Sequence, residues 1–180
     1  MFPSTRSVLP LALLIASSTF GNGQFCHPPH FGGLVPGISD DDDVVALHGE
    51  GFFSEELGHA GGRYYTDSAR SVTMVVTLGA DNVIGSVELV AGLDFPMGAP
   101  KDLTPFVSSR LDASDHGRLR VGLGANGVQV KKAYGPPAAC YQGGGNWYYP
   151  TAASRCTSDA SVNFLFTGDR VTRVAFFNGD

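Results

Sequence analysis

Two stretches of the chain alternate apolar and polar residues with the two-residue period of a β-strand that is buried on one face. Their apolar positions are Val72, Met74 and Val76 in the first stretch and Val162, Phe164 and Phe166 in the second. Turn-forming residues follow at 79–82 and 168–170, and each turn leads into another apolar segment. An aromatic segment that favours a strand precedes each stretch, at 63–65 and at 147–149. The pattern therefore predicts two antiparallel meanders of three strands.

A short helix is predicted before each meander. Ser39 stands three residues before Asp42, which is the spacing of a capping box, and the acids of residues 40–43 interact favourably with the positive end of a helix dipole. The apolar face of the first helix contains Val44, Leu47 and His48, and that of the second contains Val130, Ala133 and Tyr134. Gly49 and Gly135 stand where each helix should end, because glycine adopts the left-handed backbone of a helix stop.

The two helix-plus-meander segments repeat one another in order. Residues 44–49 correspond to 130–135, 64–65 to 148–149 and 71–77 to 161–167, at offsets of about 84 to 90 residues. We therefore predict an α+β protein of two tandem repeats, each a short helical segment packed on an antiparallel three- to four-stranded sheet. The predicted boundaries are a signal peptide at 1–23, an N-terminal tail at 24–32, repeat unit 1 at 33–91, an inter-unit connection at 92–118 and repeat unit 2 at 119–180.

The first residues have the layout of a secretory signal peptide. One positive charge at Arg6 is followed by an apolar run at 8–16 and by small residues before a cleavage site near Gly21 or Gly23. That run is too short to span a bilayer. Without the leader the chain has 11 basic and 17 acidic residues, a net charge of about −6, and no basic stripe that would suit a phosphate backbone. We therefore expect a secreted or periplasmic protein with no nucleic-acid partner and no integral membrane segment.

The chain has three cysteines, and an oxidising compartment would allow them to pair. Cys140 and Cys156 fall in the two loops that flank the aromatic segment 147–149, and a disulfide between them would close a short loop and contribute about 3 kcal/mol. Cys26 is then left over. It is free, paired between molecules or exchanged with one of the other two, and the sequence does not choose among these.

Two motifs that suggest ligands are interpreted as structural. Gly122 to Gly127 matches the Gly-x-Gly-x-x-Gly dinucleotide fingerprint, which needs a long helix in a parallel βαβ unit and an acid about 20 residues further on. The helix predicted here is short and no Asp or Glu occurs from 127 to 158, so the glycines indicate a turn. The four acids at 40–43 lack the spacing of a calcium loop and are interpreted as helix capping.

The sequence does not predict an enzyme or a cofactor. The remaining histidines, His48, His59 and His116, have no companion nucleophile motif. The second repeat has Tyr134 where the first has His48, which favours packing at a core edge over chemistry.

The alternative to a binding protein is a secreted hydrolase or metal-binding protein that uses Cys26, His27 and His30. A thiolate and imidazoles within five residues suit a soft or borderline metal, whereas the competing interpretation is a terminal tail with incidental histidines.

The aromatic segments are the best candidates for binding, because large, rigid, amphipathic side chains anchor protein interfaces. The candidate contact residues are Tyr64, Tyr65, Trp147, Tyr148 and Tyr149. Strand alternation turns about half of such residues towards a core, so an exposed patch and core packing are both open at this point.

The second repeat also resembles a known envelope module. Its order is a glycine turn at 122–124, a helix ending in Tyr134-Gly135-Pro136-Pro137, the Trp147-Tyr148-Tyr149 strand, and two strands around Gly168-Asp169. This order resembles the fold shared by the SmpA/OmlA (BamE-like) outer-membrane assembly lipoproteins and the β-lactamase inhibitory protein.

The duplicated arrangement is more similar to the inhibitory protein, a secreted tandem repeat whose concave sheet grips its target. The Cys140 to Cys156 spacing suits the loop disulfide of that fold, whereas the chain has no lipobox and its first repeat lacks a comparable cysteine pair. We therefore expect a non-catalytic module that binds another extracytoplasmic protein through the sheet surface or through the boundary between the units.

Overall fold

The computed structural model describes residues 33–69, 71–92, 122–150 and 161–178. The predicted signal peptide and N-terminal tail lie outside the described residues, and so do Cys156 and nearly all of the predicted inter-unit connection. No helix in the part that is described is long and apolar enough to cross a membrane.

Each half of the described chain contains one helix, one 3₁₀ turn and four strands. The first half consists of α1 (Asp41–His48), β1 (Phe52–Ser54), β2 (Gly62–Asp67), β3 (Val72–Leu78), η1 (Ala80–Asn82) and β4 (Ile84–Ala91). The second half consists of α2 (Gly127–Tyr134), β5 (Ala139–Tyr141), η3 (Gln142–Gly144), β6 (Asn146–Pro150), β7 (Ser161–Thr167) and β8 (Arg170–Phe177).

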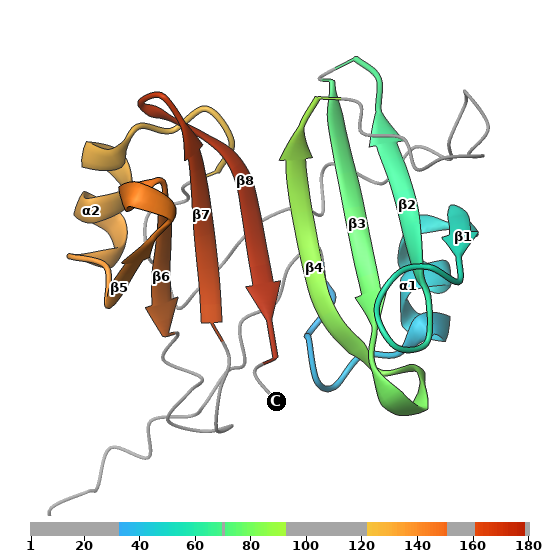
Figure 1. The fold of residues 1–180 in the computed structure, drawn as a ribbon. Coiled ribbons are helices and arrows are strands. Elements are labelled where there is room, and N and C mark those ends of the chain that lie inside the picture. The colour runs from blue at the N-terminus through green and yellow to red at the C-terminus, as the bar shows by residue number, and fades with distance from the viewer. Residues whose placement is uncertain (1–32, 70, 93–121, 151–160, 179–180) are drawn as a thin grey trace, which may run out of the picture.

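All eight strands belong to one antiparallel sheet in the order β1-β2-β3-β4-β8-β7-β6-β5 (Figure 1). The prediction of two tandem helix-on-sheet repeats was therefore wrong. The two halves join where β4 pairs with β8, with Val87 opposite Phe176 and Leu89 opposite Val174. The physical reason is that β4 and β8 would each be an unpaired sheet edge, and their pairing satisfies the backbone groups of both edges and joins the apolar faces of the two halves into one.

Both helices pack on the same face of this sheet. One row of facing residues on that side runs through Tyr65, Met74, Leu89, Val174, Phe164 and Trp147, and the next runs through Arg63, Val76, Val87, Phe176, Val162 and Tyr149. The buried residues of both halves form one continuous hydrophobic core. The strand order of the second half is the reverse of that of the first, so β2 and β6 are equivalent strands. Arg63 of β2 and Trp147 of β6 therefore occupy equivalent positions in the two halves.

The helix ends follow local rules that the sequence predicted in part. The cap of α1 is Asp40 and not Ser39: the Asp43 amide donates to the Asp40 carboxylate over 3.0 Å and the Asp40 amide donates to the Asp43 carboxylate over 3.2 Å. Ser39 instead accepts a hydrogen bond from the Val35 amide. Gly49 ends α1 with φ 84°, as predicted, a backbone angle that favours glycine.

Candidate functional site

Two of the five predicted contact residues belong to the core. Tyr65 is 0% exposed and Tyr149 is 3% exposed. The Tyr65 hydroxyl donates to the carbonyl oxygen of Gly49 over 2.7 Å, and the Tyr149 hydroxyl donates to that of Gly135 over 3.2 Å. Burial raises the pKa of both, that of Tyr149 to about 12. Each tyrosine therefore ties the sheet to the end of its helix, and neither offers a contact surface to a partner.

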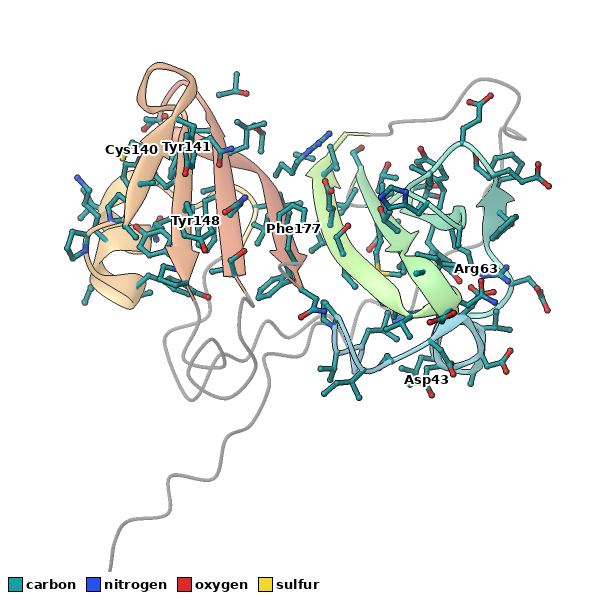
Figure 2. The ribbon with its side chains drawn as sticks, turned by 60° about the horizontal axis from the view of Figure 1, so that its bottom comes forward. Asp43, Arg63, Cys140, Tyr141, Tyr148 and Phe177 are labelled. Atoms are coloured by element: carbon teal, nitrogen blue, oxygen red, sulfur yellow. The ribbon has the colours of Figure 1, made fainter. Side chains whose placement is uncertain are left out.

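Tyr64 and Tyr148 lie on the opposite face of the sheet from the helices. They stand in one cross-strand row, in β2 and β6, with four strands between them. Because neighbouring strands are about 4.8 Å apart, the two rings are separated by roughly 24 Å. Figure 2 shows Tyr148 near Cys140 and Tyr141 at one side of the molecule and Arg63 at the other. The predicted residues therefore do not form one aromatic patch, and a binding role for Tyr64 and Tyr148 stays a prediction.

Trp147 is the predicted residue that lies at a cleft. Its ring is half-buried on the helix-covered face of β6, with its centroid 4.5 Å from that of Phe166. The indole Nε1 donates to the carbonyl oxygen of Gly144 over 2.8 Å, which fixes the ring against η3. The Lys131 ammonium from α2 lies 4.9 Å above the ring, in cation–π contact with it.

The cleft around Trp147 has a volume of about 660 Å³. Its walls are the first turn of α2, the glycines at 143–145 and the β7–β8 turn with Asp169. Because so much of this lining is glycine, the walls present backbone amide and carbonyl groups and allow a ligand to approach closely. Val128, which is 75% exposed, stands on the rim.

The matching place in the first half is closed by an ion pair. Arg63 donates from Nε to Asp41 over 2.5 Å and from Nη2 to the other carboxylate oxygen over 2.7 Å. Its Nη1 donates to the Glu50 carbonyl oxygen over 2.6 Å, and its guanidinium lies 5.3 Å from the centroid of the Phe53 ring. The hydrogen bonds to Asp41 raise the pKa of Arg63 despite its partial burial.

The first half has an ion pair where the second has a cleft because the residues differ at one helix position, Asp41 or Gly127, and at one strand position, Arg63 or Trp147. Asp41 is the first residue of α1, and Gly127 is the first residue of α2. A Cβ on Gly127 would lie 2.7 Å from the Trp147 ring, so the glycine lets helix and indole touch. The sequence singled out Trp147 but missed Gly127 and Lys131. The available signal was the alignment of the two helices, in which glycine stands where the other has an acid.

The remaining predicted site residues are placed only in part. Cys140 is exposed on β5, facing Trp147 in the neighbouring strand, and among the described residues it has no disulfide partner. Since Cys156 lies outside those residues, the predicted disulfide stays a prediction. His48 is buried, with its ring 5.9 Å from Tyr65, where packing was expected.

The described ranges contain no group of three or more His, Cys, Asp or Glu residues that could hold a metal ion. Cys26, His27 and His30 lie outside these ranges, so the alternative metal site is not placed.

Comparison with known proteins shows a similarity of fold to a solved structure. No protein-family model and no characterised sequence matches the chain. The crystal structure of YjgB, a DUF4309 family protein from Bacillus subtilis, matches with a TM-score of 0.51 at 15% sequence identity, over 82% of this chain and 83% of that one. At this identity the likeness shows the fold alone: the chain is similar to a DUF4309 family protein in its architecture.

Proposed function

We propose that the protein is a non-catalytic binding protein of a secreted or periplasmic compartment, and that it holds another protein at the cleft around Trp147. The observation that carries the proposal is the difference between matched places in the two halves. The first half fills its place with the Asp41–Arg63 ion pair, and the second leaves a cleft beside the only tryptophan of the chain.

The lining of this cleft has the composition of a protein contact site. Tryptophan and tyrosine are enriched among the residues that dominate interface energies. Val128 on the rim is one of the exposed large hydrophobic residues. Lys131 adds one cationic group. The complementary partner places an apolar side chain against Trp147 and Val128 and a carboxylate near Lys131.

The extracytoplasmic location rests on the signal-peptide layout of residues 1–23. The resemblance to inhibitory proteins predicted binding through the sheet surface, and we place the proposed contact at the end of the sheet that carries β6 and α2. The opposite end carries the closed Asp41–Arg63 contact.

A matched pair of variants tests the proposal. Val128→Asp places a charge on the rim of the cleft, and Ile38→Asp makes the same change at an exposed residue outside it. A partner captured from extracytoplasmic extract is purified and its dissociation constant is measured with wild type and both variants. We expect at least tenfold weaker binding for Val128→Asp and unchanged binding for Ile38→Asp. Equal binding by all three proteins would place the partner elsewhere.

A further inference from the structure

A second hollow lies on the face of the sheet opposite the helices, where β4, β8, β7 and β6 run side by side. In one cross-strand row Glu88 of β4 faces Ala175 of β8, which in turn faces Asn163 of β7. Because the side chain of Ala175 is a single methyl group, the row has a gap between the longer side chains of Glu88 and Asn163. The resulting pocket has a volume of about 150 Å³, and Leu165 and Phe177 complete its apolar wall.

Four polar side chains surround this gap. Arg173 lies with Nη1 3.3 Å from the carboxylate of Glu88, whose side chain is only 18% exposed. The amide oxygens of Asn146 and Asn163 are both buried, and neither has a hydrogen-bond partner among the residues that the structure describes. A buried acceptor without a donor costs about 1–3 kcal/mol, so a ligand that donates to both oxygens would recover that free energy.

The arrangement of donors and acceptors defines the ligand. Glu88, Asn146 and Asn163 line one pocket, and the carboxylate and the two amide groups together carry acceptors for the three N–H donors of an ammonium group. Arg173 uses one nitrogen for Glu88 and is partly exposed, so its other N–H groups are able to bind a carboxylate. The volume corresponds to about five water molecules at roughly 30 Å³ each, which matches a ligand of about five or six non-hydrogen atoms.

We propose that this pocket binds a small zwitterionic amino acid, of the size of glycine or alanine. Its ammonium group donates to Glu88, Asn146 and Asn163, and its carboxylate accepts from Arg173. The site goes beyond the proposed protein-binding cleft. Asn146 and Trp147 are consecutive residues of β6 and therefore point to opposite faces of the sheet, so the two sites do not share a surface.

Isothermal titration calorimetry of the purified protein with glycine and with alanine tests the proposal. We expect saturable binding of one equivalent, and weaker binding of methylamine or acetate, each of which has only one of the two charged groups. Absence of saturable binding of glycine and alanine at millimolar concentration would overturn the proposal. Methylamine binding as tightly as glycine would overturn the role of Arg173.

Three variants locate the binding. Glu88→Gln removes the carboxylate and is expected to weaken amino-acid binding at least tenfold, whereas Glu55→Gln makes the same change at an exposed residue and should leave it unchanged. Ala175→Leu fills the gap and is expected to abolish binding, with folding checked by circular dichroism. Unchanged affinity in Glu88→Gln, which keeps the size of the side chain, would show that the amino acid binds elsewhere.

Discussion

Replacement of Gly127 by alanine tests whether the contact between α2 and β6 shapes the Trp147 cleft. The new Cβ would lie 2.7 Å from Cη2 of the indole and 3.4 Å from Cζ2 and Cζ3. Carbon atoms in good packing are about 3.5–4.0 Å apart, so the ring or the helix must move by roughly 1 Å. The backbone of Gly127 needs no positive φ, and steric contact is therefore the main obstacle to a side chain there.

Two opposing contributions set the magnitude. Alanine is favoured over glycine by up to about 1 kcal/mol inside a helix, and by less in the first turn. Overpacking typically costs about 1–3 kcal/mol, so we expect Gly127→Ala to destabilise the protein by about 1 kcal/mol. In a Trp147→Phe background the outer ring atoms are absent, and the same substitution should become neutral or stabilising by about 0.5 kcal/mol.

Urea unfolding of wild type, the two single variants and the double variant measures this change of sign. Trp147 is the only tryptophan, so a shift of its emission in Gly127→Ala reports the displaced ring directly. Gly122→Ala is the matched control, because a Cβ there meets nothing within 4 Å. If Gly127→Ala changed the free energy of unfolding equally with and without the indole, the contact would not exist as described.

Three further predictions concern the rest of the fold. Asp41→Asn should lower the free energy of unfolding by about 2 kcal/mol in urea titrations, since Arg63 is only 13% exposed and loses the nearer of its two carboxylate partners, Asp41 and the exposed Glu50. Asp42→Asn in the same helical turn should cost less than about 0.5 kcal/mol. Burial raises the pKa of Tyr149 from 10.0 to about 12, so the tyrosine of the unfolded chain ionises at lower pH than that of the folded protein. The free energy of unfolding should therefore fall as the pH rises through this range. Unfolding experiments at several pH values should show a shallower fall for Tyr149→Phe. The core shared across β4 and β8 should give one unfolding transition, with Trp147 fluorescence and far-ultraviolet circular dichroism coinciding; separate transitions would contradict it.

The sequence predicted elements whose signal is local. The alternation of apolar and polar residues around Met74 and Phe164 correctly predicted strands β3 and β7, and Gly49 correctly predicted the end of α1. The pairing of β4 with β8 was not predicted. The alternation of apolar and polar residues shows that one face of a strand is buried, but it does not show which strand pairs with it. The start of α1 was misplaced by one residue, since serine and aspartate are both good caps and Asp43 reciprocates with Asp40.

The candidate site was predictable to a similar degree. Strand parity places neighbouring tyrosines on opposite faces, yet the sequence does not tell which face receives the helix, and Tyr65 proved to be the buried one. The contact of Gly127 with Trp147 joins a helix and a strand about 20 residues apart, and it depends on how closely the helix approaches the sheet. Such a distance follows from packing, which residue patterns do not encode.

A partner that binds at the cleft around Trp147, in the second half, breaks fewer strong contacts than one that binds at the equivalent place in the first half. In the first half Arg63 is already held by Asp41 and by the Glu50 carbonyl, so a ligand there would have to break charged hydrogen bonds. In the second half the contact over the Trp147 ring is the ammonium of Lys131, a side chain on the exposed surface of α2. An exposed cation–π contact contributes only about 0.5–1 kcal/mol. An apolar side chain of a partner that displaces Lys131 from the indole therefore costs little free energy and buries aromatic surface. Displacing Arg63 in the first half would instead break its charged hydrogen bonds to Asp41.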